Sequence, residues 1–482
     1  MRNILSKRDL RHLNLIEILN MKRELTPLRE LNEILSVPIR TIHSDIQEIN
    51  SYIHPLVIRS CPTGVRLVIP ENYSLAYIYK LIFENSQEFR LIEYIFVNEK
   101  KSLEQVSSAL FISESTTKRI IKKLNTIFSE HNFKISTSPM AIIGDEKKIT
   151  QFLSSYFQEK YTKPDFIEQE ERTLIHEIIK DLFDDTGKEL HFNKLKKYTI
   201  WIYIGIIRMK HNHQVHLDNN RVIDIPIIHN KVFCARFYRQ FGFELTLNTF
   251  TQLIYARTTE KYIVDYFELE VRSKIDSNLA DLKENVETKI KDLISQTSLK
   301  INKASKESVI LDVINLTRIR DYYIFILFDR REYFLSRLSD NYRQVKTFIR
   351  PFIEDITSPS LNEDEINELT YILLTHLPGL FDKLRFIEKK ILIHILVDTD
   401  VEHAQFIKKE LDTYSRFNIR TKIMYDYSFD EIYKLNKDQI LITTIPGIEN
   451  TECKVLCFTD YFSSRNWHQL NELIIGILNE DN

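Results

Sequence analysis

The chain has 482 residues, of which 43% are hydrophobic and 28% are charged, and its formal net charge is −2. This length predicts three or more domains, and so ordinary a composition excludes a disordered or fibrous chain. With only 8 glycines and 12 prolines, the sequence favours long helices over a β-sandwich.

The four cysteines, Cys61, Cys234, Cys453 and Cys457, form no dense framework, so we expect a reducing compartment. No run approaches the roughly 18 apolar residues of a membrane span, and the first residues are too charged for a signal peptide. We therefore expect a cytoplasmic protein without a membrane partner. Residues 1–134 hold 19 Lys and Arg against 15 Asp and Glu, a mild basic bias that is weak evidence for a nucleic-acid partner.

Three helices and a hairpin are predicted at the start of the chain. Apolar residues at helical spacing indicate helices over 10–21, 27–35 and 39–49, with Thr26 as the cap of the second helix. Two β-rich runs flank Pro62-Thr63-Gly64, which is typical of a hairpin. This order is that of a winged helix-turn-helix, whose third helix enters the major groove of duplex DNA.

The candidate DNA contacts of this first unit lie on the third helix and on the hairpin. They are Arg40, Thr41, His43, Ser44, Arg59 and Arg66. Three amphipathic helices without a DNA role are the alternative. The phrase Pro-Ile-Arg-Thr-Ile-His-Ser-Asp-Ile, residues 38–46, resembles the S-x-R-T-I-x-R-D-I phrase of bacterial winged-helix regulators. Pro38 and Ser44 depart from it, where a capping Ser and a basic residue are usual.

The same pattern recurs about 75 residues later. Ser102 and Gln105 predict a capping box, Ser113 can cap a third helix from Glu114 to about His131, and a second wing is expected over 133–143. A solvated basic face without a partner is the alternative to DNA binding. The candidate contacts are Ser115, Thr116, Thr117, Lys118, Arg119, Lys122 and Lys123.

The middle of the chain reads as two helical bundles, and the whole layout resembles the Mga/AtxA class of Gram-positive virulence and global regulators. The resemblance implies a multidomain, mainly α fold. Its expected domains are two winged helix-turn-helix units, two helical regulation domains and a small C-terminal α/β domain, at 1–72, 73–160, 161–285, 286–388 and 389–482. It also implies a homodimer or higher homo-oligomer and a phosphocarrier protein of the sugar phosphotransferase system as a partner.

Phosphorylation on histidine is what the resemblance implies for the bundles, and His376 fits the family phrase. It lies on the apolar side of a predicted helix that Pro378-Gly379 should end. A buried, structural histidine is the alternative. The first bundle has Trp201 at one position where the family often has His, and Thr258-Thr259 near another. His211, His213 and His216 lie in a polar loop without a partnering cysteine, so we expect no metal site and no cofactor.

Strands and helices alternate after residue 389, which predicts a small α/β domain. It resembles the IIB component of sugar phosphotransferases, which needs a cysteine nucleophile after its first strand. Here that loop is Asp398-Thr399-Asp400-Val401. We therefore expect a domain for association and a protein that is not an enzyme.

The sequence thus predicts a transcription regulator that binds duplex DNA through two recognition helices and reads DNA shape for part of its selectivity. An RNA-binding antiterminator and a phosphotransfer protein are the alternatives.

Overall fold

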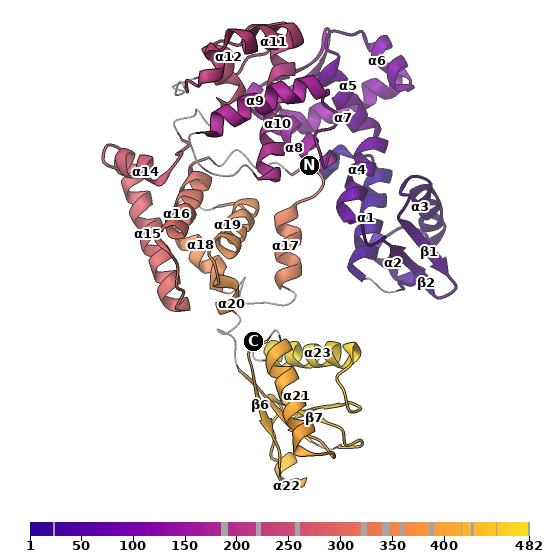
Figure 1. The fold of residues 1–482 in the computed structure, drawn as a ribbon. Helices are drawn as coiled ribbons and strands as arrows, with labels where there is room; N and C mark the ends of the chain where they lie inside the picture. Colours follow the sequence, from indigo (N-terminus) through magenta and orange to yellow (C-terminus); the bar gives the residue numbers. More distant parts are fainter. Residues whose placement is uncertain are drawn as a thin grey trace. The chain divides into compact units, whose positions relative to one another are not determined.

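The computed structural model describes residues 1–22, 25–184, 191–217, 223–255, 261–319, 325–339, 348–356, 361–384, 390–415, 417–425, 429–449 and 451–480. It divides into two compact units. The first comprises Met1–Tyr262 with Ile319–Asp329, and the second comprises Ile263–Arg318 with Arg330–Asn482. The fold is mainly helical with small sheets, including a parallel sheet near the C-terminus, which confirms the predicted fold class (Figure 1).

The first part of the chain folds as three helices followed by a hairpin. Its elements are η1 (Arg2–Ile4), α1 (Lys7–Lys22), α2 (Leu28–Leu35), α3 (Ile39–Tyr52), β1 (Val57–Cys61) and β2 (Gly64–Val68). Leu13, Leu31 and Ile42, one from each long helix, are buried in a shared core. A one-sided apolar stripe leaves water when three helices pack together, so this prediction is confirmed.

Thr26, two residues before α2, extends the hairpin. Thr26 and Val65 exchange two backbone hydrogen bonds, each 2.9 Å long. The N-cap of α2 is Pro27, so the predicted capping position was wrong by one residue. Gly64 has φ +155°, and a Cβ there would lie 2.5 Å from the Thr26 carbonyl oxygen. Only glycine permits so close an approach of the two backbones.

The same order of elements recurs in the next part of the first unit. It consists of α4 (Leu75–Asn85), α5 (Gln87–Val97), α6 (Leu103–Leu110), α7 (Glu114–Ser129), β3 (Phe133–Thr137), β4 (Met140–Gly144) and α8 (Glu146–Lys160). The capping box of Ser102 and Gln105 is formed, and the Ser113 side chain accepts a hydrogen bond from the Thr116 amide. Both caps confirm the predictions from the sequence.

An asparagine holds the wing in each of these parts. Asn50 of α3 donates to the Ile58 carbonyl (2.9 Å) and accepts from its amide (2.8 Å). Asn125 of α7 makes the same two bonds to Ile135, at 2.9 and 2.7 Å. Ile135 is therefore the counterpart of Ile58, and the two wings can be aligned residue by residue.

A helical bundle completes the first unit. Its elements are α9 (Gln169–Asp184), α10 (Phe192–Lys210), η2 (Pro226–His229), α11 (Lys231–Phe241) and α12 (Leu247–Leu253). Ile178, Ile206, Phe237 and Phe250 share its buried core. Helix α8 packs against both α10 and α4, so the bundle and the helix-turn-helix part are joined through one helix.

A short segment that follows α16 in the chain is held within this first unit. The Glu159 carboxylate accepts hydrogen bonds from the amides of Ile326, Leu327 and Phe328, at 2.7, 2.9 and 3.1 Å. The Phe328 ring stacks on Tyr79, with centroids 4.5 Å apart. Polar and aromatic contacts therefore fix the segment to α8 and α4.

In its described residues, the first part of the second unit contains seven helices. They are α14 (Tyr266–Ser273), α15 (Ser277–Thr297), α16 (Lys303–Arg318), α17 (Arg330–Ser339), α18 (Arg350–Ile356), α19 (Glu363–His376) and α20 (Leu380–Leu384). Helix α19 ends before Pro378-Gly379, as predicted. Helix α15 runs unbroken across residues 285 and 286, so we propose a boundary between the two helical domains near Ile263 instead.

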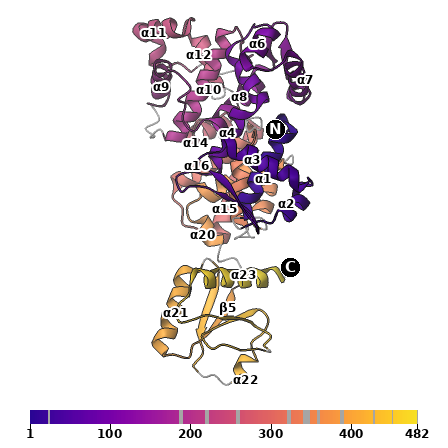
Figure 2. The same ribbon diagram turned by 90° about the vertical axis from the view of Figure 1, so that its right-hand side faces the viewer.

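The last part of the second unit is a four-stranded parallel sheet with helices. Its elements are β5 (Ile391–Leu396), α21 (Val401–Tyr414), β6 (Ile419–Ile423), α22 (Phe429–Ile432), β7 (Gln439–Thr443), β8 (Lys454–Cys457) and α23 (Ser464–Glu480). The strand order is β6-β5-β7-β8. Ile393 and Ile395 face a core shared with Ile407 of α21 and Leu470 of α23, and both helices are visible beside the sheet in Figure 2. The predicted α/β architecture is confirmed.

Candidate nucleic-acid interface

Helix α7 presents the more basic of the two candidate recognition faces. Ser113 caps its first turn, which leaves Ser115 and the cations that follow on regular helical backbone. Ser115, Lys118, Arg119 and Lys122 are exposed, and Thr116 is half-buried. The exposed ion pair of Lys118 with Glu114 spans 4.0 Å, too long and too hydrated to neutralise the lysine. This face can therefore meet an anionic partner.

Two of the predicted contacts on α7 do not reach that face. The Thr117 side chain is 0% exposed, and its hydroxyl lies 2.9 Å from the Ser107 hydroxyl of α6. It also donates to the Ser113 carbonyl at 3.1 Å. Thr117 therefore joins the two helices of the helix-turn-helix, and its side chain is not available as a base contact.

Lys123 turns back toward the start of the chain. Its Nζ donates to the carbonyls of Ile4 (2.7 Å) and Leu5 (2.6 Å), and lies 3.2 Å from a carboxylate oxygen of Glu88. A lysine with three such partners is already neutralised and fixed. It anchors the N-terminal turn on α7, and we no longer include it among the phosphate contacts.

Helix α3 offers fewer charges. Arg40, His43 and Ser44 are exposed and Thr41 is half-buried, so the four predicted residues share the solvent side of the helix. Pro38 occupies the N-cap without a side-chain cap bond. The Thr41 amide donates to the Pro38 carbonyl, but the earlier amides of Ile39 and Arg40 can face a ligand, as amides do at helix N-termini that bind phosphate.

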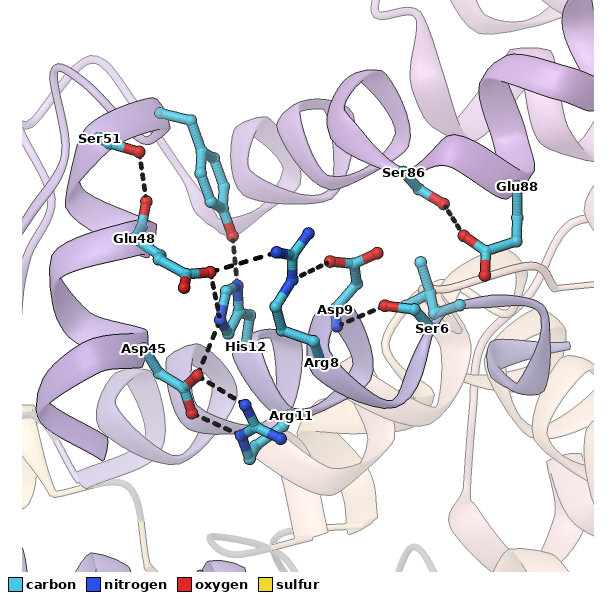
Figure 3. Close-up of polar contacts among 12 residues, drawn as sticks. Ser6, Arg8, Asp9, Arg11, His12, Asp45, Glu48, Ser51, Ser86 and Glu88 are labelled. Carbon is cyan, nitrogen blue, oxygen red and sulfur yellow. Dashed lines mark hydrogen bonds and ion pairs between the residues drawn. The ribbon is translucent and has the colours of Figure 1, made fainter. Parts of the chain in front are cut away.

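The side of α3 that faces α1 is held by a buried polar network (Figure 3). Asp45 accepts two hydrogen bonds from the Arg11 guanidinium, at 2.5 and 2.7 Å, and one from His12 Nε2 at 3.1 Å. Burial lowers the pKa of His12, and Asp45 opposes that shift. The pKa of Asp45 is lowered by Arg11 and His12, although burial opposes the shift. The network positions α3 beneath its exposed face.

The sequence pattern did not reveal this network. Asp45 belongs to the phrase that resembles winged-helix regulators, but its partner His12 lies 33 residues earlier on a helix that carried no motif. One feature of the sequence does indicate a buried polar contact. Asp45 lies within the apolar face of Ile42, Ile46 and Ile49, and a buried carboxylate needs a partner.

The first wing carries a pair of arginines that repel each other. Arg59 and Arg66 lie directly opposite in the hairpin register and both are exposed. Like charges at such a pair destabilise a hairpin unless an anion lies between them. In the second wing, aligned on Ile58 and Ile135, the counterparts are Ser136 and Ala141. The first wing therefore has a facing pair of arginines that the second wing lacks at the aligned positions.

Comparison with known proteins also identifies a helix-turn-helix domain in this part of the chain. Residues 71–157 match the Mga helix-turn-helix domain family. A putative trans-acting regulator of Streptococcus pneumoniae serotype 4 is 24% identical over 474 residues, which cover 93% of this chain and 94% of the relative. The capsule synthesis positive regulator AcpB of Bacillus anthracis is 21% identical, over 71% of this chain and 74% of its own. These similarities confirm the predicted resemblance to the Mga/AtxA class of regulators.

The matched Mga domain extends from just before α4 to near the end of α8, so it contains α7 and the second wing. An anthrax toxin expression trans-acting positive regulator of Bacillus anthracis is 23% identical over 31% of this chain and 32% of its own. The chain is thus a transcription regulator with a DNA-binding helix-turn-helix domain of the Mga type. Among the described residues, no helix combines the length and hydropathy that crossing a membrane requires.

His376 is the last residue of α19. Its side chain is 43% exposed, and Nδ1 lies 2.8 Å from a carboxylate oxygen of Asp312 on α16. The sequence placed it on the apolar side of the helix, but the ring turns outward where the helix ends. A buried structural role is therefore wrong, and the ring is accessible.

The other histidines singled out in the sequence have separate partners. His211 Nε2 donates to the Val97 carbonyl (3.3 Å), and His213 Nε2 lies 2.7 Å from Glu99. Trp201 is buried against Tyr255. Thr258 and Thr259 lie outside the described residues. Within the described part of the chain, no three His, Cys, Asp or Glu side chains gather as a metal site would require.

Proposed function

We propose that the protein is a positive transcription regulator that places α3 and α7 on duplex DNA, with the first wing on the backbone beside α3. The exposed cations of α7, Lys118, Arg119 and Lys122, carry the proposal, because a row of cations on a capped, rigid helix matches a phosphate-lined groove. The Bacillus anthracis relatives AcpA and AcpB are known as positive regulators of capsule synthesis, which supports activation as the direction of control.

In this proposal, the two helix-turn-helix parts have different roles. Helix α7, with Ser115 and Thr116 near its start, supplies affinity through phosphates. Helix α3 presents Arg40, Thr41, His43 and Ser44 to base edges, and Arg59 and Arg66 hold a phosphate between them. Because so few side chains of either helix can form bidentate base contacts, DNA shape supplies part of the selectivity.

Binding to a labelled duplex across a salt series tests the proposal, beside single-stranded DNA and RNA of the same length. We expect duplex preference and a steep loss of affinity between about 50 and 200 mM salt. Lys118→Ala with Lys122→Ala should flatten the slope of log K against log salt by about two. Lys300→Ala with Lys303→Ala, two exposed lysines of the second unit, is the control. Preference for RNA, or a slope unchanged by the first pair, overturns the proposal.

Phosphorylation of His376 by a phosphocarrier protein of the sugar phosphotransferase system is the regulatory part of the proposal. Because a carboxylate can only accept, the contact with Asp312 favours the tautomer that carries its proton on Nδ1, in which Nε2 has the lone pair that accepts the phosphoryl group. The phosphoryl group would leave a histidine nitrogen of the carrier and bond to Nε2. It would add nearly two negative charges beside Asp312, which favours a rearrangement of α16 against α19.

Transfer of labelled phosphate from the carrier to the full chain tests this site. His376→Ala should abolish labelling, and Asp312→Asn should slow it because the ring loses its orientation. His468→Ala, at an exposed histidine of α23, should label normally. Labelling that survives His376→Ala shows that the site is elsewhere.

Self-association through the C-terminal α/β part is the last element of the proposal. Phe406 of α21 and Tyr461 are both exposed, with ring centroids 6.4 Å apart, and they form an apolar pair on the surface. Sedimentation over a range of concentrations should show a dimer or a larger oligomer that Phe406→Glu weakens. Tyr238→Glu, at an exposed tyrosine of α11, is the control. A monomer at all concentrations contradicts this element.

A further inference from the structure

The turn between α6 and α7 contains an aromatic residue in an unfavourable position. Phe111 has φ 56° and ψ 41°, in the left-handed region, and is 91% exposed. Its amide donates to the carbonyls of Ser107 and Ser108 and closes α6. The backbone of Phe111 therefore has a structural role, but its ring packs on almost nothing.

The first helix-turn-helix shows that the turn does not need this ring. Ser36 ends α2 in the same place with φ 54° and ψ 39°. The two backbones are nearly identical, and in the first the residue is small and polar. A bulky side chain is disfavoured in the left-handed region, and an exposed ring loses the benefit of burial. Phe111 therefore combines two unfavourable features that folding does not explain.

The position of Phe111 points to the partner. It lies two residues before Ser113, the N-cap of α7, and therefore at the end of the recognition helix that faces base edges in helix-turn-helix complexes. The neighbouring exposed residues of α6 are Ser108 and Ala109, which are small and uncharged. The ring is thus exposed at the N-terminal end of α7, the helix that carries Lys118 and Arg119.

We propose that Phe111 contacts the C5-methyl groups of thymines in the major groove and selects for them; this inference rests on the proposed docking of α7. A phenyl ring can neither pair with a phosphate nor hydrogen bond to a base edge. The thymine methyl is the apolar group that a major groove displays, and phenylalanine is among the side chains that contact it.

Removing only the methyl groups provides the test. A duplex that the protein binds is prepared twice, once with thymidine and once with deoxyuridine throughout. The wild-type chain should bind the thymidine duplex more tightly, by about fourfold for each methyl that the ring covers. Phe111→Ser, which copies the first turn, should abolish this difference, and Phe111→Leu should keep part of it. Because the wild-type and Phe111→Ser chains are compared on the same two duplexes, any effect of the methyl groups on DNA shape cancels.

Three controls make the result specific. Phe111→Ser should leave the salt slope unchanged, because no charge is removed. Phe192→Ser, at an exposed phenylalanine of α10, should keep the thymidine preference. Phe111→Gly should raise the midpoint of thermal unfolding while it weakens binding, because glycine adopts the left-handed turn without strain.

The outcomes separate this inference from the proposed function. A wild-type chain that binds no duplex contradicts the docking of α7 itself. A chain that binds duplex but loses the same affinity for both DNAs on Phe111→Ser overturns the methyl contact alone. A change in sedimentation on Phe111→Ser, with the thymidine preference intact, assigns the ring to a contact between copies of the chain and also overturns it.

Discussion

The Arg208 guanidinium donates to the Glu99 carboxylate over 2.7 Å, and both side chains are less than 3% exposed. Arg208 also donates twice to Glu146, at 2.7 and 2.8 Å, and once to the Ile142 carbonyl. His213 completes the cluster on the other oxygen of Glu99. Helix α10 of the first bundle is thus joined to the second wing, to α8 and to the segment after α5 by a buried ionic cluster.

Replacing Arg208 should be strongly destabilising. Arg208→Met leaves two buried carboxylates without their cation, and breaking a buried pair in this way costs about 3–5 kcal/mol. Urea unfolding, followed by the fluorescence of Trp201 in a Trp467→Phe background, measures the free energy. Arg236→Met is the matched control, because that arginine pairs with Glu177 while both are more than a third exposed, and its loss should cost less than about 1 kcal/mol. Equal losses of unfolding free energy in Arg208→Met and Arg236→Met would contradict the stabilising role of the buried cluster.

The local elements were predictable because their signals lie within a few residues. The capping box at Ser102 and the hairpin at Gly64 are examples, since neighbouring side chains and backbone determine both. Thr117 and Lys123 were assigned to the DNA face because they follow cations and hydroxyls in the sequence. Their partners, Ser107 and the carbonyls of Ile4 and Leu5, are set by how helices pack. Such pairings have no local signature.

The segment bound by Glu159 should loosen when that carboxylate is removed. Glu159→Ala leaves the amides of Ile326, Leu327 and Phe328 without their acceptor, and each unsatisfied amide is costly. Amide hydrogen exchange, followed by mass spectrometry, should become faster over residues 325–329. Glu168→Ala, at an exposed glutamate, is the control. Unchanged exchange in Glu159→Ala would mean that other contacts hold the segment, namely the stacking of Phe328 on Tyr79 and the hydrogen bonds from Met1 and Arg2 to its carbonyls.

Acid should destabilise the first winged helix through His12. Burial lowers the pKa of this histidine below its ordinary value of about 6.5. The unfolded chain therefore takes up a proton more readily than the folded one. The contribution of the neutral His12 ring to stability is complete when the pH is above that ordinary value. It is lost as the pH falls below it toward the pKa of His12 in the folded chain. The thermal midpoint should fall between about pH 7 and pH 5.

His12→Asn removes the titrating ring but keeps an amide donor for Asp45, so the midpoint should depend less on pH in this variant. His54→Asn, at an exposed histidine, should retain the dependence of the wild-type chain. Identical pH profiles for the wild-type chain and His12→Asn would contradict the role of His12.

The second wing should depend on Asn125. Asn125→Ala removes both hydrogen bonds to Ile135 and leaves a buried amide and carbonyl unsatisfied, at a cost of about 1–3 kcal/mol. Exchange of the amides over residues 133–144 should become faster while that of α6 stays slow. Asn85→Ala removes one exposed bond to the Leu81 carbonyl and should change little. Equal protection of the wing in the wild-type chain and Asn125→Ala would show that the strand pairing is sufficient.

Replacing His394 should stabilise the C-terminal α/β part. This histidine lies on β5 between Lys422 and Leu441 and is only 5% exposed, yet neither ring nitrogen has a hydrogen-bond partner among the described residues. Burial, reinforced by Lys422, lowers its pKa, so the folded state holds a neutral but unsatisfied ring. An unsatisfied buried polar group costs about 1–3 kcal/mol, and leucine has a similar volume without polar atoms.

His394→Leu should therefore raise the unfolding midpoint, which is followed by the fluorescence of Trp467 in a Trp201→Phe background. His468→Leu, at an exposed histidine of α23, should leave that midpoint unchanged. A lower midpoint for His394→Leu would show that the ring makes a stabilising contact that leucine cannot replace.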